Sequence, residues 1–128
     1  MRLRPGDPVL RMDNRLSLGG RPVVHDRITV SAALFRGLTE KRFRSRPGTV
    51  YSLYQTGFGI TVLRAHERVR AAAADAEAVR VLGLRPGAPV LQVQRLALSF
   101  GDRPVELRLS TVHTAHHDYV TLRGPGAP

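Results

Sequence analysis

The stretch "LRPGDPVLRMDNR" (residues 3–15) recurs, slightly altered, as "LRPGAPVLQVQR" (residues 84–95). The copies continue alike through "LSLGGRPVV" and "LALSFGDRPVE", so each contains a Pro-Gly turn, an apolar run, a glycine turn and Arg-Pro-Val. Their register slips by a residue or two, which strands absorb as bulges or longer turns. Two copies this far apart are too few for a solenoid. We therefore predict a single domain that is built from two related β-hairpins.

The composition is that of one globular domain. A chain of 128 residues, 42% of them hydrophobic and 23% charged, can bury one core and is not expected to be disordered. No apolar run approaches the roughly 20 residues that span a bilayer, and the N-terminus lacks an apolar signal core. We therefore expect no membrane segment and a cytoplasmic protein. The absence of cysteine excludes disulfides, thiolate catalysis and cysteine-based zinc sites.

Arginine supplies nearly all of the positive charge. The formal net charge is +10, and Lys41 is the one lysine among the 20 basic residues. The arginines are spread along the chain and are densest in "EKRFRSR" (residues 40–46). We interpret this segment as a solvated loop, with a phosphate-contacting loop as the alternative. No recognition helix or RNA-stacking signature accompanies the arginines, so charge alone does not indicate a DNA reader.

The order of expected elements predicts an α+β fold. Alternating apolar residues and glycine turns indicate strands at residues 8–18, 21–30, 60–72, 89–100 and 103–114. Helices are expected at residues 31–40 with Ser31 as N-cap, at residues 49–55, and at residues 74–84 with Gly83 as the C-terminal stop. Together these elements predict a mostly antiparallel sheet of five to six strands with the helices packed on one side.

Three charged residues fall in otherwise apolar rows of their strands. Because side chains alternate between the two faces of a strand, Asp26, Glu67 and Arg95 share their faces with valine, leucine, isoleucine or alanine. A buried and unpaired charge costs several kcal/mol. Each of the three is therefore expected to have a partner of opposite charge, a hydrogen-bond donor or acceptor, or a wet cavity.

The repeat relates these residues to further polar ones. Aligning the two copies gives Arg15 the role of Arg95, with Ser17 two residues further on, and matches Asp26 with Arg108. The last expected strand carries a polar row of Glu106, Arg108 and Ser110.

This set has two interpretations. The charges could form internal ion pairs, such as Asp26 with Arg95 or Glu67 with Arg15, that fix strand register. Alternatively, convergent polar groups on an apolar sheet face form a small-molecule pocket. Arginines there suit a carboxylate or phosphate, and the acids suit hydroxyl or amino groups of the same ligand. For the set as a whole we favour the pocket.

The sequence contains no recognisable catalytic motif and only a weak metal-binding motif. No Ser-His-Asp order, "GxSxG" or phosphate-binding "GxxxxGK[ST]" is present. The spacing in "HTAHH" (residues 113–117) could bind a metal, but no neighbouring carboxylate or cysteine completes it. We expect no enzyme activity, no metal and no cofactor.

Over residues 5–119 the sequence resembles the UTRA domain, the effector-binding half of HutC-type GntR transcription regulators, related in fold to chorismate lyase. The resemblance is carried by "PGxPVLxxxR", "RPV", "YSLY", "LGLRPGAPVL" and "PVE" in order. It implies a chorismate-lyase-like sheet with a central effector pocket, a homodimer, and a winged helix domain that precedes this one and is absent here. We expect the domain to cover residues 1–123, with residues 124–128 as a flexible tail.

The resemblance also implies site residues. The family's ligand contacts fall on Arg15, Asp26, Ser52 and Glu106, and Ser52 lies near a helix N-terminus that favours an anionic group. Ser17 and "HTAHHDY" depart from the pattern of sugar-phosphate sensors, so an organic acid or aromatic carboxylate is at least as well supported as a phosphosugar. The expected ligand-binding residues are Arg15, Ser17, Asp26, Tyr51, Ser52, Tyr54, Glu67, Arg95, Glu106 and Arg108.

The predicted function is that of an effector-sensing domain of a bacterial transcription regulator, a repressor. It would bind an anionic or carboxylate-bearing small molecule and contact DNA only through the missing N-terminal domain. Two alternatives remain. A chorismate-lyase-like enzyme predicts product formation from chorismate. A basic nucleic-acid-binding module predicts salt-dependent DNA affinity of this chain alone.

Overall fold

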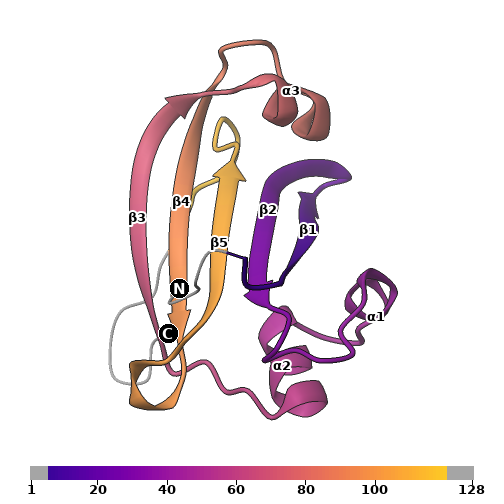
Figure 1. Ribbon diagram of the computed structural model, residues 1–128. Coiled ribbons are helices and arrows are strands. Elements are labelled where there is room, and N and C mark those ends of the chain that lie inside the picture. Colours follow the sequence, from indigo (N-terminus) through magenta and orange to yellow (C-terminus); the bar gives the residue numbers. More distant parts are fainter. Residues whose placement is uncertain (1–5, 121–128) are drawn as a thin grey trace.

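A five-stranded antiparallel sheet forms the body of the molecule (Figure 1). The computed structural model describes residues 6–120, so the predicted domain end at residue 123 and the tail beyond it lie outside the described residues. The strand order is β1-β2-β5-β4-β3. The strands are β1 (Val9–Leu18), β2 (Arg21–Ser31), β3 (Arg64–Ala73), β4 (Pro89–Leu98) and β5 (Pro104–Val112). The helices are α1 (Glu40–Arg44), α2 (Val50–Phe58) and α3 (Ala76–Leu82), with a 3₁₀ turn η1 (Phe100–Asp102) between β4 and β5.

The sequence repeat becomes a pseudo-two-fold symmetry of the sheet. The hairpins β1–β2 and β4–β5 meet where their second strands, β2 and β5, pair antiparallel. Around the central pair Arg27–Leu109, Asp26 faces Ser110 just as Arg108 faces Ile28. Asp26 and Arg108 therefore occupy equivalent places in the two halves, as the repeat alignment predicts. The α+β class, the antiparallel sheet and the two related hairpins are confirmed.

The counterpart of Arg95 is Asn14 and not Arg15. Asn14 faces Asp26 across β1 and β2, just as Arg95 faces Arg108 across β4 and β5. The prediction of Arg15 at this place is wrong, because the two copies of the repeat correspond one residue earlier in the first strand. Since side chains alternate, a slip of one residue moves a side chain to the other face of the sheet.

The two faces of the sheet differ in what covers them. The inner face is the one covered by α1 and α2. One row of side chains on it runs across four neighbouring strands through Met12, Ile28, Arg108 and Arg95. The main core lies there, built from buried side chains of strands, loops and both helices: Met12, Ile28, Val30, Phe35, Leu38, Phe43, Val50, Leu53 and Tyr54. The outer face carries the alternate residues, among them Arg11, Arg15, His25 and Arg27.

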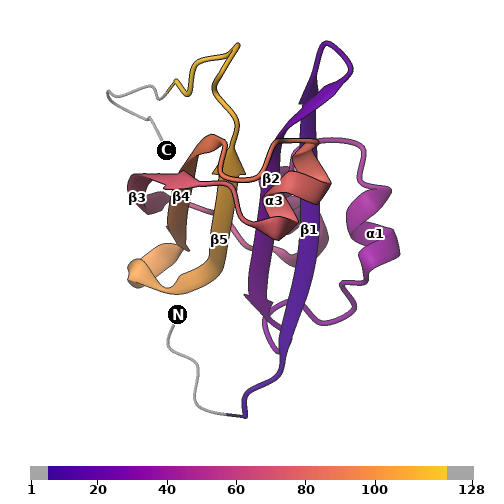
Figure 2. The ribbon, with the colours of Figure 1, turned by 90° about the horizontal axis from the view of Figure 1, so that it is seen from above.

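Helix α3 packs on the outer face, so the prediction that all helices lie on one side is wrong for α3. It lies above the upper end of β2 in Figure 1 and in front of β2 in Figure 2. Ala78 packs in a small buried cluster with Val90, whose side chain points to the outer face because Leu91 points inward. Glu77 also approaches His25 of the outer face. The apolar side of this helix therefore finds its partner on the opposite side of the sheet from α1 and α2.

The helix expected at residues 31–40 does not form. Ser31 ends β2, and residues 32–37 form turns, after which Thr39 caps α1 by accepting a hydrogen bond from the Arg42 amide at 3.1 Å. "EKRFR" is therefore a short helix and not the predicted loop. Tertiary packing decides this, because Phe35 from the turns and Phe43 from α1 both fill the core. Similarly, β3 begins at Arg64, whereas the sequence predicted a start at residue 60.

Gly83 ends α3 as the sequence predicts, whereas α2 runs three residues past the predicted end at residue 55, to Phe58. The Thr49 hydroxyl caps α2 and the Asp75 carboxylate caps α3, each accepting from a backbone amide three residues on. Gly59 and Gly83 end these helices in the left-handed conformation, with φ of 66° and 65°. Glycine reaches this region without the steric cost that a Cβ atom imposes.

We therefore expect Gly83→Ala to lower the free energy of unfolding by about 1 kcal/mol, because alanine is strained at positive φ. Gly48→Ala is the matched control, since Gly48 lies outside the left-handed region and its added Cβ would meet Ser52 at an ordinary 3.8 Å. Urea denaturation of the two variants measures the difference. Equal losses would contradict the assigned role of Gly83.

Candidate functional site

A buried carboxylate lies at the centre of the inner face. Glu106 of β5 has 0% exposure. Its Oε1 accepts from Arg108 Nε at 2.8 Å, and its Oε2 accepts from Arg108 Nη2 at 3.0 Å and from the Tyr54 hydroxyl. Arg108 and Glu106 share a face because they are two residues apart on one strand. The ion pair and the tyrosine of α2 thus fix the guanidinium of Arg108 in place.

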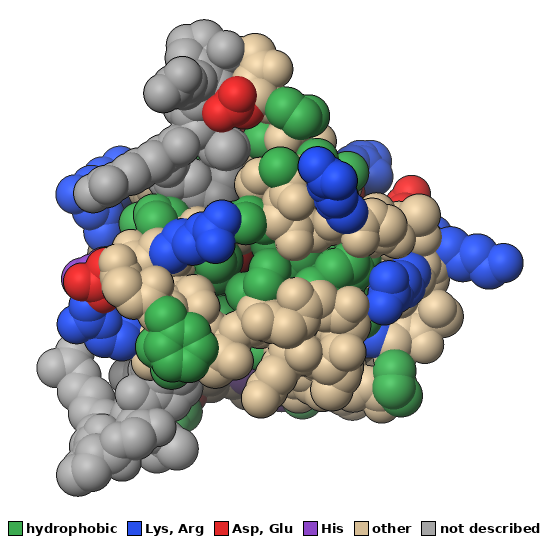
Figure 3. Space-filling view, turned by 60° about the horizontal axis from the view of Figure 1, so that its bottom comes forward, with side chains coloured by type: hydrophobic (Ala, Val, Ile, Leu, Met, Phe, Trp, Pro, Cys, Tyr) green, Lys and Arg blue, Asp and Glu red, His purple; other side chains and the backbone are tan. Residues whose placement is uncertain are grey.

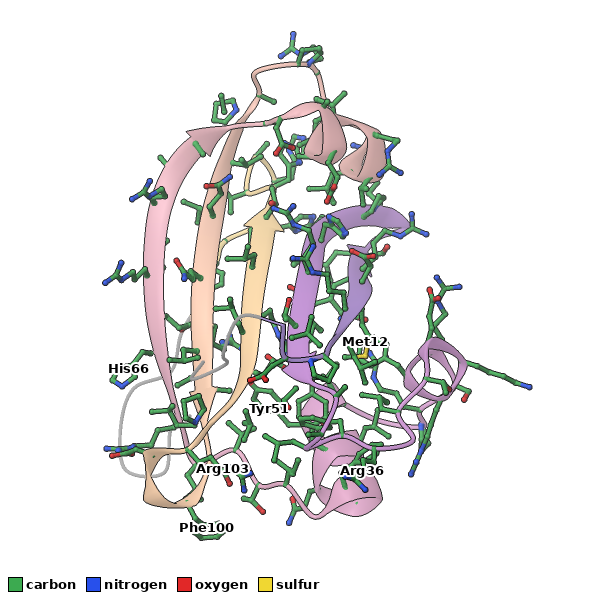
Figure 4. All side chains as sticks on the ribbon, viewed as in Figure 1. Met12, Arg36, Tyr51, His66, Phe100 and Arg103 are labelled. Atoms are coloured by element: carbon green, nitrogen blue, oxygen red, sulfur yellow. The ribbon has the colours of Figure 1, made fainter. Side chains whose placement is uncertain are left out.

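A second arginine lies beside the first. Arg95 of β4 faces Arg108 of β5 directly across the ladder. Like charges in that position repel each other, so each needs an acid. Arg95 Nε donates to Glu67 Oε2 at 3.1 Å, and its Nη1 donates to the Tyr51 hydroxyl at 3.4 Å. Tyr51 also packs its ring 5.2 Å from the guanidinium carbon of Arg108, and Figure 4 shows Tyr51 between α2 and the strands.

The segment after β5 completes this network. The Tyr119 hydroxyl donates to Glu67 Oε2 at 3.0 Å, on the same oxygen that Arg95 binds. Hydrogen bonds therefore run from Tyr51 of α2 through Arg95 and Glu67 to the segment after β5, and the cation–π contact of Tyr51 with Arg108 links them to Glu106 and Tyr54. Tyr119 was not among the residues predicted from the sequence.

Asp26 forms a second polar group on the inner face. It is 3% exposed and accepts from Ser110 Oγ at 2.5 Å and from Asn14 Nδ2 at 3.2 Å. Arg46 Nη2 in turn donates to Asn14 Oδ1 at 3.0 Å. Asp26 is thus satisfied by neutral donors, and it is close enough to Arg108 to help raise the pKa of that arginine.

Six predicted residues form two hydrogen-bonded groups that the cation–π contact of Arg108 with Tyr51 joins, and we call them the arginine cluster: Tyr51, Tyr54, Glu67, Arg95, Glu106 and Arg108. Asp26 lies on the same face beside it. The other three lie elsewhere. Arg15 faces His25 on the outer face, Ser17 lies at the bulge near the hairpin turn, and Ser52 is exposed on α2.

Neither ion pair suggested by the sequence forms, because strand order decides which charges meet. Glu67 pairs with Arg95 and not with Arg15, since β3 is the neighbour of β4. Asp26 has no ion pair among the described residues. Tyr119, Asn14 and Ser110 complete the contacts, and of these Ser110 was visible in the polar row of the last strand.

The burial of the cluster keeps its tyrosines protonated. Burial raises the pKa of Tyr54 far above its ordinary value, and Glu106 adds to this effect. Burial, followed by the charge of Glu106, also raises the pKa of Tyr51. Burial lowers the pKa of Arg108, but Glu106, Tyr51 and Asp26 together outweigh it, so the pKa is raised. The cluster therefore presents hydroxyl donors and charged guanidinium groups at neutral pH.

No three His, Cys, Asp or Glu side chains within residues 6–120 are arranged to hold a metal ion. No helix in this range is long and apolar enough to cross a membrane.

The chain belongs to the UTRA domain family, whose family model matches residues 1–118. The fold matches the ligand-binding domain of a protein assigned to the GntR family of transcriptional regulators, from Bordetella bronchiseptica. That match has a TM-score of 0.90 and 36% identity, and covers 95% of this chain and 77% of that chain. None of the curated proteins compared with the chain matches it.

More distant structures share the fold. The effector domain of PhnF from Mycobacterium smegmatis matches with a TM-score of 0.78 and 20% identity, covering 93% of this chain and 72% of that one. The C-terminal domain of Yurk from Bacillus subtilis matches with a TM-score of 0.82 and 16% identity, covering 92% and 80%. Family and fold together identify the chain as an effector-sensing regulatory domain of the GntR type.

The two acids of the arginine cluster should differ in their contribution to stability. Glu106→Gln leaves Arg108 without its buried counter-charge, so we expect a loss of about 3–5 kcal/mol in the free energy of unfolding. Glu67→Gln should cost about 1 kcal/mol or less, because the Glu67 side chain is 26% exposed and its ion pair is screened by water. Chemical denaturation at neutral pH measures both. A larger loss for Glu67→Gln would contradict the central role of Glu106.

The three tyrosines predict a pH dependence. Their pKa values are all raised by burial from the ordinary 10.0. The unfolded chain therefore loses tyrosine protons first, and the stability that depends on this shift is complete below pH 10 and falls above it. We expect tyrosinate absorbance of the folded chain to rise only above pH 10, and Tyr54→Phe to make the fall shallower by about 1.4 kcal/mol per pH unit. An unchanged slope would show that Tyr54 ionises freely.

Proposed function

We propose that the effector of this domain carries a carboxylate that binds between Arg95 and Arg108. The observation that carries the proposal is the direct pairing of two guanidinium groups across β4 and β5. Guanidinium groups present planar, paired N–H donors that match a carboxylate. The Arg95 side chain is 29% exposed, whereas that of Arg108 is 12% exposed and held by Glu106. Arg95 thus offers the accessible donors and Arg108 the preorganised charge.

The charge balance favours a singly charged group over a phosphate. Glu67 and Glu106 already match the two arginines, and Asp26 adds a further negative charge on the same face. A doubly charged phosphate would meet three carboxylates on the inner face, so an organic acid or aromatic carboxylate fits better. Asp26 and Ser110 would accept or donate hydrogen bonds to hydroxyl or amino groups of the same ligand.

The network suggests how binding is sensed. A carboxylate on Arg95 competes with Glu67 and Tyr51 for the same guanidinium, and Glu67 also holds Tyr119. Effector binding would therefore change how α2 and the segment after β5 rest on the sheet. A ligand with different affinity for the two arrangements shifts their populations and thereby acts on an attached domain.

The regulator around this domain is part of the same proposal. We propose that it is a HutC-type repressor that acts in the cytoplasm as a homodimer, without catalytic activity, and contacts its operator through a winged helix domain N-terminal to this one. The GntR-type neighbours support this reading, and the match to whole PhnF from Mycobacterium smegmatis covers 52% of that longer chain.

A thermal-shift screen tests the site. The panel contains amino acids, organic acids, aromatic carboxylates and sugar phosphates, and a ligand at a hundred times its Kd stabilises by about 2.7 kcal/mol. We expect one carboxylate class to raise the Tm of the wild-type chain. Arg95→Gln should abolish the shift.

Arg15→Gln is the matched control, because it removes the same charge from the outer face. It should keep the shift. A shift that Arg15→Gln abolishes and Arg95→Gln retains would place the effector on the outer face. Stabilisation by sugar phosphates alone would contradict the carboxylate assignment.

A further inference from the structure

Arginines gather on the outer face of the sheet, away from the arginine cluster. One cavity there, of about 240 Å³, is lined by Arg27, Arg68 and Arg70 and by no carboxylate. A larger open cavity of about 1060 Å³ shares Arg27 and extends around the edge strand β1, from α3 on the outer face to α1 beside the inner face. Its charged lining includes Arg11, Arg15, Arg80, Asp13 and Glu77 on the outer face, and Arg44 and Arg46 on the α1 side.

The positive charge of the outer face is largely uncompensated. The two acids of the larger cavity are both held by His25, whose ring nitrogens lie 3.0 Å from Asp13 and 3.4 Å from Glu77. Glu77 also lies 3.6 Å from Arg27. Within residues 6–120, five arginines of this face make no ion pair: Arg11, Arg15, Arg68, Arg70 and Arg80. The inner face differs, since Arg95 and Arg108 each have an acid.

The unpaired arginines are too widely spread for one compact anion. A single row crosses all five strands from Arg70 of β3, through Gln92, Thr111 and His25, to Arg15 of β1. Four strand spacings separate its ends, which is about 19 Å. One bank of arginines is formed by Arg68 and Arg70 of β3, and the other by Arg11 and Arg15 of β1 with Arg80 of α3. Between the two banks lie Arg27 and uncharged side chains, among them Gln92, Gln94, Leu109 and Thr111. This pattern fits an extended polyanion that crosses the sheet.

We propose that the outer face is a docking surface for the phosphate backbone of duplex DNA. Duplex DNA carries one negative charge per about 1.7 Å of its axis, so it can meet both banks at once. A second copy of this chain would instead oppose arginine with arginine. The face reads no sequence, because contacts to phosphates position a protein without specifying bases. The proposal does not rest on the proposed effector site, whose residues lie on the opposite face.

Fluorescence anisotropy with a labelled duplex of mixed sequence tests the proposal with the full chain. We expect binding at low salt that weakens as salt rises, because each neutralised phosphate contributes about 0.9 to the slope of log K against log salt. The variant Arg68→Gln/Arg70→Gln should make this slope shallower by about 2, for any duplex sequence.

The control is Arg36→Gln/Arg103→Gln, which removes the same charge from the lower end of the molecule in Figure 4. Both arginines are exposed, and the basic side chains on the face seen in Figure 3 stand apart from one another. This variant should change the slope by well under 1. Matching thermal unfolding of both variants shows that neither effect comes from misfolding.

Four results would overturn the proposal. The first is no binding of the duplex at low salt, and the second is an equal change of slope in both double variants. The third is one-to-one binding of inorganic triphosphate that displaces the duplex, which would make the face a site for a compact anion. The fourth is self-association that only Arg68→Gln/Arg70→Gln abolishes, which would make the face an interface between copies.

Discussion

The buried carboxylate of Glu106 is the constraint on which the inner face depends. It has no contact with solvent, so its charge is tolerated because Arg108 and the Tyr54 hydroxyl both bind it. These contacts join β5 to α2 and hold the guanidinium of Arg108 beside Arg95. A side chain that is already fixed loses little freedom when a ligand arrives. The ion pair therefore matters more for orienting Arg108 than for the net stability it adds.

The two hairpins of the repeat have equivalent backbone positions but carry different polar side chains at them. Asn14 and Asp26 face each other in the first half at the places that Arg95 and Arg108 occupy in the second. One half thus offers an amide and an acid, and the other offers two cations. The two halves of the inner face therefore differ in charge, so an asymmetric ligand has one preferred orientation on it.

Sequence alternation was sufficient to single out Asp26, Glu67 and Arg95, because strand side chains change face with a period of two. It failed at Arg15, since an error of one residue in the repeat alignment exchanges the faces. It also could not pair the charges, because Glu67 meets Arg95 through strand order, which alternation does not encode. Tyr119 belongs to no regular element, so no periodicity pointed to it. The helix expected after β2 does not form, because core packing overrides the local helix propensity.

The central pairing of β2 with β5 also bears on how the chain folds. Each hairpin closes through a short glycine-containing turn, which is a local event. The junction between the hairpins is different, because α1, α2, β3, α3 and β4 all lie between its two strands in the chain. Closing such a long loop costs entropy before its contacts form, and non-local pairing slows folding. The two halves of the repeat are therefore expected to form early, and their union late.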